Sequence, residues 1–273
     1  MARKLPLAPG RILRALRQSY RTLREIAERL DRIEYMMRLR VGSPIDHYVT
    51  HSYALRTDGL FDGTYDLWRV TRIAKILSIY GLESVSGKRI LELGAGHGDI
   101  GAFFASLGAE VTCVDGREEN LTFGRLKYRD VPGIDFVLAD LDEDFGHLGR
   151  FDLILNLGLL YHLESVEKHL ERCFQISDEM ILESVVCDST DPDAIYLVDE
   201  DSAVNEEALG GRGSRPSPFF IERIATEAGF EVERHFTADL NAGEYVYDWE
   251  HKNDGSYDDY QRRRFWRFSR AHS

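Results

Sequence analysis

The stretch that decides the fold is RILELGAGHGDIG (residues 89–101), together with the VTCVD that ends at Asp115. A short apolar run typical of a buried strand leads directly into Gly94, Gly96 and Gly98. Glycines here allow a tight turn and let backbone N–H groups approach a ligand at the positive end of the following helix. Asp115 stands at the tip of the next strand, where a carboxylate can accept hydrogen bonds from both ribose hydroxyls. This pattern predicts a site for a nucleoside-bearing cofactor.

Strand-like and helix-like segments alternate outward from this stretch. Runs rich in β-branched and apolar residues lie at 89–93, 110–115, 135–139, 151–157 and 180–186, with helix-like segments between them at 100–107, 120–128 and 165–176. Such alternation predicts right-handed βαβ units and a mostly parallel sheet. The runs 230–236 and 263–268 have no crossover helix between them, so the last strand should be antiparallel. We therefore expect a doubly wound α/β domain.

We place this α/β domain at residues 43–273, and residues 1–42 precede it as a separate segment. A long helix in residues 1–42 has apolar residues at steps of three and four with arginines between them. It fits a coiled coil that makes a homodimer, a basic helix in peripheral contact with an anionic membrane, or a helix packed on the protein's own body. An insertion is expected at 189–216. After it, Ser217 and Pro218 should cap and open another helix.

Composition and charge exclude several classes of protein. The net charge is −13, and residues 1–40 hold 11 Lys and Arg against 4 Asp and Glu, which leaves 23 against 43 in the remainder. A body this acidic disfavours a nucleic-acid partner, because such binding neutralises phosphates with Lys and Arg. No apolar run reaches the roughly 18–20 residues of a transmembrane helix, and no secretory signal is expected. Three cysteines without a CxxC spacing predict a reduced, cytoplasmic protein.

The glycine loop alone fits two kinds of cofactor. Gly96, Gly98 and Gly101 satisfy the G-x-G-x-x-G pattern of dinucleotide sites, which is a weak match by itself. Counted from Gly94, however, the pattern is G-x-G-x-G, and Asp99 stands where the third dinucleotide glycine belongs. An NAD-dependent oxidoreductase therefore stays an alternative at this point.

Over residues 85–240 the sequence resembles class I S-adenosylmethionine-dependent methyltransferases. The matching residues are Glu92, Gly94, Ala95, Gly96, Gly98, Asp115, Ala139, Asp140 and the strand 152–157. The resemblance implies a seven-stranded sheet, a Rossmann-like fold and S-adenosylmethionine as the cofactor, with no metal assigned.

The resemblance also implies a role for each part of the cofactor site. The glycine loop lies against the methionine part of the cofactor, and the acid that matches Asp115 binds the ribose. The side chain that matches Asp140 reaches the adenine amino group, while Asn156 and Leu157 pass beside the sulfonium. We assign Gly116 and Leu141, which follow the two acids, to the same site. Asp140 also belongs to an acidic run that would suit a solvated surface.

The segment GLLYHL (residues 158–163) resembles the region after the fourth strand of small-molecule and wobble-uridine methyltransferases. It lacks the [DN]-P-P-[YF] tetrad of enzymes that methylate amino groups, which favours an oxygen acceptor. His162 is the candidate general base, with Tyr161 beside it, because a hydroxyl acceptor holds its proton tightly. Two other roles stay open for His162, a structural one and a metal ligand. No ligand spacing supports a site that joins it to Asp188, Asp191 or Asp193.

Two further segments are candidates for acceptor binding. In GGRGSRPS, Arg212 and Arg215 on a flexible loop would clamp a carboxylate or phosphate. In YVYDW, Tyr247, Asp248 and Trp249 combine aromatic rings with an acid, which suits stacking on a sugar or an aromatic ring. A plain solvent loop and core packing are the structural alternatives for the two segments.

Together these features predict a methyltransferase that acts on an oxygen of a small molecule or of a glycan sugar. Three alternatives stay open: a tRNA-modifying methyltransferase, an NAD-dependent oxidoreductase and a non-catalytic scaffold that binds the cofactor. The sequence leaves the acceptor and the oligomeric state undetermined.

Overall fold

The computed structural model describes residues 64–204, 207–257 and 261–271. The chain divides into two units, 1–68 and 69–273, and nearly all described residues belong to the second. The helix predicted in residues 1–42 lies outside the described residues, so its role in dimerisation or membrane contact stays a prediction. No helix in the described part of the chain combines the length and apolarity that a bilayer crossing needs.

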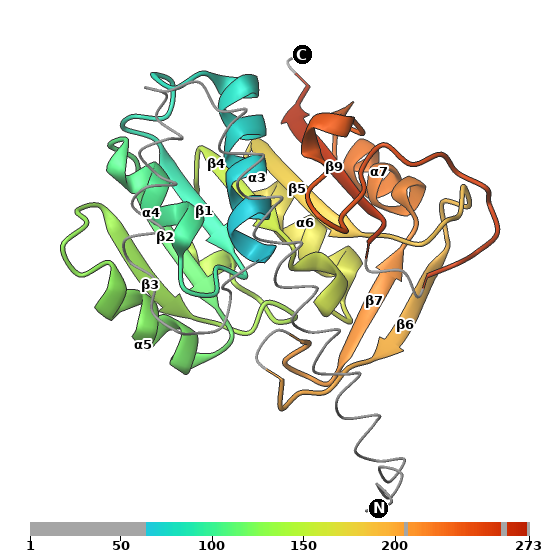
Figure 1. Ribbon diagram of the computed structural model, residues 1–273, viewed down its shortest axis with the longest axis horizontal. Coiled ribbons are helices and arrows are strands. Elements are labelled where there is room, and N and C mark those ends of the chain that lie inside the picture. Colours follow the sequence, from blue (N-terminus) through green and yellow to red (C-terminus); the bar gives the residue numbers. More distant parts are fainter. Residues whose placement is uncertain (1–63, 205–206, 258–260, 272–273) are drawn as a thin grey trace, which may run out of the picture. The chain divides into compact units, whose positions relative to one another are not determined.

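A seven-stranded sheet forms the centre of the second unit (Figure 1). Its strands are β1 (Arg89–Leu93), β2 (Glu110–Asp115), β3 (Ile134–Leu138), β4 (Leu153–Leu157), β5 (Glu179–Val185), β8 (Phe230–Arg234) and β9 (Arg263–Arg270). They lie in the order β3-β2-β1-β4-β5-β9-β8. β1 to β5 pair in parallel, whereas β9 is antiparallel to both β5 and β8. The structure therefore confirms the predicted mostly parallel α/β sheet with an antiparallel last strand.

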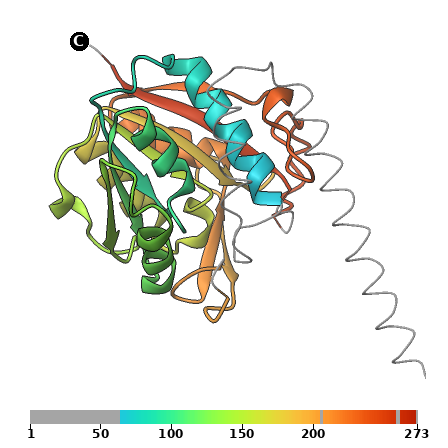
Figure 2. The same cartoon turned by 60° about the vertical axis from the view of Figure 1, so that its left-hand side comes forward.

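Helices cover both faces of this sheet, as expected for a doubly wound fold (Figure 2). They are α3 (Thr64–Tyr80), α4 (Asp99–Ser106), α5 (Glu118–Lys127), α6 (Val166–Ile176) and α7 (Pro218–Glu227), with 3-10 turns η1 (Gly146–Leu148), η2 (Leu160–His162) and η3 (Ala238–Leu240). The Ser217 side chain caps α7 by accepting a hydrogen bond from the Phe220 N–H at 2.9 Å, and Pro218 occupies the first turn. The predicted start of this helix is confirmed.

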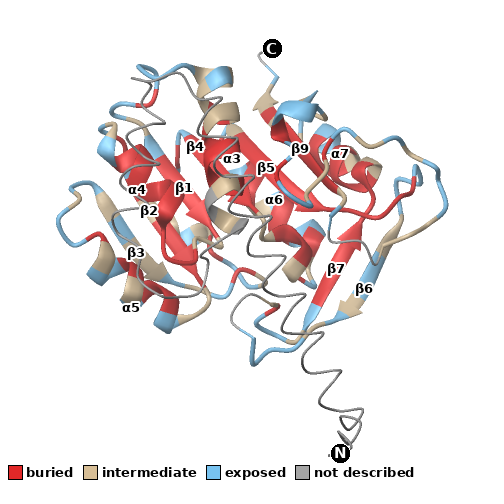
Figure 3. Ribbon diagram, viewed as in Figure 1, coloured by how far each residue is buried: buried red, intermediate tan, exposed pale blue. Residues whose placement is uncertain are grey.

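The central strands are buried along most of their length (Figure 3), and alternate side chains pack on opposite faces of the sheet. On one face, Leu91, Ile154 and Trp266 pack with apolar residues of α6 and α7 in a single buried cluster. On the other face, Glu92 contacts α4, because its carboxylate accepts a hydrogen bond from the Gly101 N–H. Central strand β4 is buried along its whole length, as its continuous apolar sequence predicts.

The insertion holds structure that the sequence analysis did not predict. β6 (Ile195–Asp199) and β7 (Arg212–Pro216) pair as an antiparallel hairpin with its own two-stranded sheet. The expectation of a flexible loop in GGRGSRPS is therefore wrong, because Arg212–Pro216 is a strand with Gly213, Ser214, Arg215 and Pro216 buried. The hairpin lies beyond the carboxyl ends of the central strands (Figures 1 and 2).

Candidate active site

The glycine loop between β1 and α4 has the backbone conformation that its sequence predicts. Gly94, Gly96 and Gly98 have φ angles of 66°, 56° and 76°, a region that L side chains rarely adopt. At Gly94 a Cβ atom would also lie 2.8 Å from the Leu159 Cβ, which is closer than carbon atoms pack. The loop thus requires glycine for its turn and for its close approach to the segment after β4.

Asp115 joins the end of β2 to this loop. Its Oδ2 accepts a hydrogen bond from the Gly96 N–H at 2.8 Å, and its Oδ1 accepts bonds from the Arg117 N–H at 2.9 Å and from Asn120 Nδ2 at 3.1 Å. Burial raises the pKa of Asp115, against the effect of these donors. A carboxylate has about four lone-pair sites, so acceptor capacity remains for a ligand hydroxyl.

Glu92 supports the loop from inside the fold. Its carboxyl is buried, and its Oε2 accepts hydrogen bonds from the Gly101 N–H at 2.8 Å and from Cys113 Sγ at 3.3 Å. Burial raises the pKa of Glu92 to about 7. The structure therefore places this predicted cofactor residue beneath the first turn of α4, where its role is to hold the helix that follows the glycine loop.

The segment after β3 carries Asp140 and Leu141. Asp140 is exposed, and its Oδ1 accepts a hydrogen bond from the Asp142 N–H at 3.0 Å. Leu141 is buried, and its carbonyl accepts a hydrogen bond from His169 Nδ1 at 2.9 Å. The two residues thus have different surroundings, with an accessible carboxylate followed by a firmly held backbone.

A buried pair links this segment to the end of β4. His169 Nε2 lies 2.8 Å from Asn156 Nδ2. Burial lowers the pKa of His169 to about 4, so the ring is neutral, with its proton on Nδ1 toward Leu141 and a lone pair on Nε2 toward Asn156. Sequence analysis missed His169, whose only signal was its place on the apolar face of α6.

His162 and Tyr161 lie in η2, directly after β4, and so at the same edge of the sheet as Asp115. His162 Nδ1 lies 2.6 Å from Glu200 Oε2, and its side chain is 17% exposed. No described residue bonds to His162 Nε2. Tyr161 is buried, and its hydroxyl accepts a hydrogen bond from Arg263 Nη2 at 3.1 Å. An imidazole held at Nδ1 with Nε2 available has the arrangement of a general base.

Beneath Tyr161, a buried ionic cluster surrounds Glu183 of β5. Its carboxylate accepts hydrogen bonds from Arg263 Nη1 at 2.9 Å, from the Tyr247 hydroxyl at 3.1 Å and from Arg72 Nη2. Burial alone would raise the pKa of Glu183, but Arg72 and Arg263 hold it below its ordinary value. Because Arg263 bonds to both Glu183 and Tyr161, the cluster fixes the position of the Tyr161 ring.

Arg215 does not have the place predicted for it. It is buried in β7, where it donates hydrogen bonds to the Tyr161 carbonyl at 2.9 Å and to Glu200 Oε1 at 3.2 Å. It therefore supports η2 and Glu200 instead of clamping an anion from a flexible loop. Arg212 is half-exposed and pairs with Glu164 at 3.0 Å.

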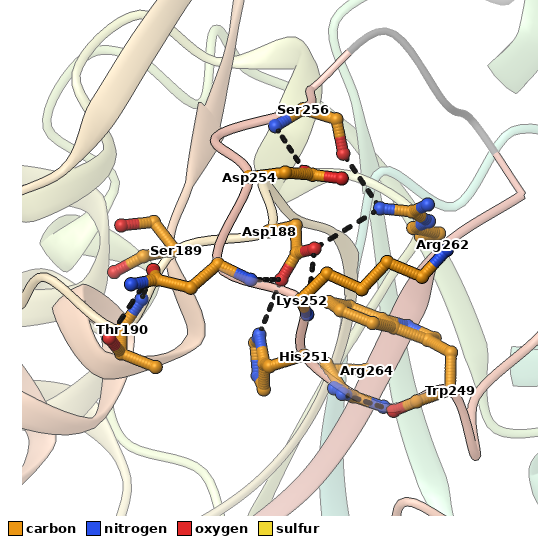
Figure 4. A network of polar contacts seen from close by, with 12 residues as sticks. Asp188, Ser189, Thr190, Trp249, His251, Lys252, Asp254, Ser256, Arg262 and Arg264 are labelled. Atoms are coloured by element: carbon orange, nitrogen blue, oxygen red, sulfur yellow. Dashed lines mark hydrogen bonds and ion pairs between the residues drawn. The ribbon is translucent and has the colours of Figure 1, made fainter.

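The aromatic–acid segment is also largely occupied by contacts within the protein (Figure 4). Tyr247 is buried against Glu183, as above. Asp248 is exposed and accepts a hydrogen bond from Asn241 Nδ2 at 2.9 Å. The Trp249 Nε1–H donates to the Arg263 carbonyl at 3.1 Å, and the Arg264 guanidinium lies 3.7 Å from the centre of the Trp249 ring. Packing, the alternative open for this segment, accounts for Tyr247 and Trp249.

Asp188, one of the three acids considered as partners of His162, instead anchors the chain after Trp249 (Figure 4). It accepts hydrogen bonds from His251 Nδ1 at 2.9 Å and from the N–H groups of Lys252 and Asn253 at 3.1 and 3.2 Å. Across the described ranges, no group of three or more His, Cys, Asp or Glu side chains is arranged to hold a metal ion.

The central part of this chain is similar to known proteins. Residues 90–178 match a family described as a methyltransferase domain. A 91-residue stretch is 33% identical to the ubiquinone biosynthesis O-methyltransferase of Mesorhizobium japonicum, covering 33% of this chain and 36% of that protein. The corresponding protein of Aromatoleum aromaticum is 30% identical over 94 residues, covering 34% and 40%. The chain thus spans less than half the length of the curated relatives it matches.

Solved structures share the fold. The N-terminal domain of EvdMO1 with SAH bound superposes with a TM-score of 0.57 and 23% identity, covering 81% of this chain and 84% of that chain. Magnesium protoporphyrin IX methyltransferase from Synechocystis PCC 6803 with bound SAM gives 0.50 and 15%, covering 81% and 90%. The family match and the shared fold confirm the resemblance to class I S-adenosylmethionine-dependent methyltransferases.

Proposed function

We propose that this chain, with its methyltransferase domain at residues 90–178, transfers a methyl group from S-adenosylmethionine to an oxygen atom of a small molecule. The observation that carries the proposal is the position of two groups at one edge of the sheet. Asp115, bonded to the glycine loop, is the last residue of β2, and His162, bonded to Glu200, follows β4. Ligands of open α/β sheets bind at this carboxyl edge.

The residues at this edge fit the cofactor. Gly94, Gly96 and Gly98 carry no side chain, so the backbone N–H groups of the glycine loop can approach the methionine part closely. Asp115 would accept a hydrogen bond from one ribose hydroxyl, and the exposed Asp140 would accept one from the adenine amino group. Ala95, Gly116, Asn156 and Leu157 complete the proposed site around these contacts.

His162 would act on the acceptor. When bound, S-adenosylmethionine supplies a methyl group on a positively charged sulfur, and it leaves as S-adenosylhomocysteine. The acceptor hydroxyl must lose its proton as its oxygen gains the methyl group, and His162 Nε2 would take that proton. The resulting imidazolium would be stabilised by the Glu200 carboxylate, 2.6 Å from Nδ1. Buried Tyr161 would form the adjoining wall that excludes water.

An oxygen acceptor of small size has two supports. Both curated relatives are named ubiquinone biosynthesis O-methyltransferases, and the segment after β4 lacks the tetrad of enzymes that methylate amino groups. The glycan alternative depended on the helix predicted in residues 1–42, which lies outside the described residues, and on the aromatic–acid segment. The contacts of Tyr247 and Trp249 within the protein remove the second of these supports. The three cysteines are free and buried, which agrees with the proposed cytoplasmic location.

Calorimetric titration of the full chain with S-adenosylhomocysteine tests the cofactor, with NAD titrated in parallel. We expect micromolar binding that weakens about tenfold or more in Asp115→Asn, because hydrogen bonds to a charged group contribute about 1.5–3 kcal/mol. Asp130→Asn, which changes an exposed carboxylate after α5, is the matched control and should bind normally. Binding of NAD alone would overturn the proposal.

The acceptor is tested by transfer of a labelled methyl group from S-adenosylmethionine to a panel of phenols, catechols, free sugars and tRNA. We expect a methyl ether on a hydroxyl of a small molecule as the product and loss of transfer in His162→Ala with cofactor affinity retained. Transfer to tRNA alone, or to nitrogen, would contradict the proposed acceptor class.

A further inference from the structure

Glu200, at the start of the loop between β6 and β7, makes three hydrogen bonds that hold its carboxylate in one place. The side chain is only 1% exposed. Its Oε2 accepts bonds from His162 Nδ1 at 2.6 Å and from the Ala208 N–H at 2.7 Å, while its Oε1 accepts a bond from Arg215 Nη2 at 3.2 Å. A carboxylate fixed in this way orients the imidazole that it contacts.

β7 is shaped to let Glu200 reach η2. At Gly213 an added Cβ would overlap the Tyr161 carbonyl oxygen and lie 2.6 Å from Glu200 Oε1. No side chain therefore fits between the hairpin and the turn that carries His162. The close approach is a property of the backbone, independent of the hydrogen bonds that cross it.

Arg117, close to Asp115, forms hydrogen bonds to the loop between β6 and β7. The Arg117 guanidinium donates hydrogen bonds to the carbonyl oxygens of Ser202 at 3.1 Å, Val204 at 3.1 Å and Glu207 at 3.2 Å. The backbone N–H of Arg117 donates to Asp115 Oδ1 at 2.9 Å. One residue thus contacts both the proposed ribose acid and the loop that supplies Glu200.

The side chain of Leu209 adds an apolar contact at this point. A Cβ atom on Gly116 would lie 2.9 Å from Leu209 Cδ2, so the loop packs directly on the residue that follows Asp115. The loop therefore touches the proposed cofactor site at Gly116 and the proposed base at His162.

We infer that Glu200 is a positioning residue that fixes the tautomer of His162, and that Arg117 is a positioning residue that holds the Glu200 loop in place. This inference rests on the proposed function of His162 as the base. Glu200 accepts the Nδ1–H, so the single proton of the neutral ring stays on Nδ1 and the lone pair stays on Nε2. Only that tautomer can use Nε2 to take a proton from the hydroxyl that receives the methyl group.

The tautomer can be measured without knowing the acceptor. Full-length protein carrying ¹⁵N-labelled histidine and bound S-adenosylhomocysteine is studied by long-range ¹H–¹⁵N NMR, at a pH where the ring carries one proton. The His162→Gln variant identifies the signals by their loss. We expect the wild-type proton on Nδ1. In Glu200→Ala no carboxylate accepts the Nδ1–H, and a measurable share of the rings should carry the proton on Nε2.

Matched variants distinguish a positioning role of Glu200 and Arg117 from a general loss of structure. Arg117→Gln should give a mixture of tautomers, because the loop loses three hydrogen bonds. Glu164→Gln and Arg125→Gln change exposed residues near η2 and on α5, and both should keep the wild-type tautomer. A wild-type proton on Nε2, or an unchanged tautomer in Glu200→Ala, would overturn the inference.

Kinetics add a second readout once an acceptor is turned over. Glu200→Gln should lower kcat about 100-fold with KM and cofactor affinity little changed, since a general base contributes about 10²–10⁴-fold. The substitution should cost nothing further in the His162→Ala background. Failure of the wild-type protein to bind S-adenosylhomocysteine would refute the proposed function, whereas normal kcat in Glu200→Gln would refute only this inference.

Discussion

The buried carboxyl of Glu92 should make the stability of this protein fall as the pH rises. Burial raises the pKa of Glu92 from 4.5 to about 7, so the folded protein keeps a proton that the unfolded chain releases above pH 4.5. The stabilisation that comes from this retained proton is complete below pH 4.5 and is lost as the pH rises through 7. One pKa unit corresponds to about 1.36 kcal/mol, and integrating between pH 5 and pH 8 gives a loss of about 2.5 kcal/mol.

Replacement of Glu92 by Gln removes this titration while keeping an oxygen that can accept the Gly101 N–H. Urea unfolding of both proteins at pH 5, 6, 7 and 8 gives the free energy of unfolding at each pH. The wild-type value minus the Glu92→Gln value should fall by about 2.5 kcal/mol over that range. Other titrating groups cancel in this difference, because they are present in both proteins.

Glu110→Gln is the control, because Glu110 is an exposed glutamate at the first position of β2. It should keep the pH dependence of the wild-type protein. If Glu92→Gln and wild type lose stability in parallel from pH 5 to pH 8, burial does not keep the Glu92 carboxyl protonated, and the reasoning is refuted.

Three further predictions concern the glycine loop, a helix cap and a buried histidine. Gly94→Ala should lower the free energy of unfolding by about 2 kcal/mol and more than Gly87→Ala, because Gly94 and Gly87 have φ angles of 66° and 77° but only a Cβ at Gly94 would meet Leu159; equal losses by urea unfolding would contradict this. Ser217→Ala should cost about 1 kcal/mol in the same assay through loss of the α7 cap, with Ser217→Gly costing less. Burial lowers the pKa of His169 from 6.5 to about 4, so the wild-type free energy of unfolding minus that of His169→Gln should fall by up to about 3 kcal/mol as the pH falls from 6.5 to 4; an unchanged difference would show that the ring is not buried in its neutral form.

The amino-acid sequence by itself determined the sheet and the glycine loop at the carboxyl edge of its parallel strands. The strands predicted at 89–93 and 110–115 match β1 and β2 exactly in their bounds, and the other predicted strands differ from the structure by one or two residues at their ends. Such elements depend on periodicity and on turn residues within a few positions, and both are visible in one segment. The glycine loop and Asp115 also follow from local chemistry, since positive φ and a strand tip need no distant partner.

Only the tertiary structure decided which polar side chains meet. Glu200 lies in a run of acids that suits a solvated loop, yet it is buried against His162, 38 positions earlier. Arg215 and Tyr247, predicted to contact an acceptor, are instead buried against Tyr161 and Glu183. The physical reason is that burial of a charged side chain requires a partner, and the partners of these side chains come from segments distant in the sequence.

The β6–β7 hairpin is a part of the backbone fold that the sequence alone did not predict. RGSRP has little intrinsic preference for a strand, and its glycine and proline favour a loop. It becomes a strand because it pairs with β6, and because Gly213 allows the backbone to lie against η2. Pairing between segments distant in the sequence, which no local pattern records, thus placed Glu200 beside His162.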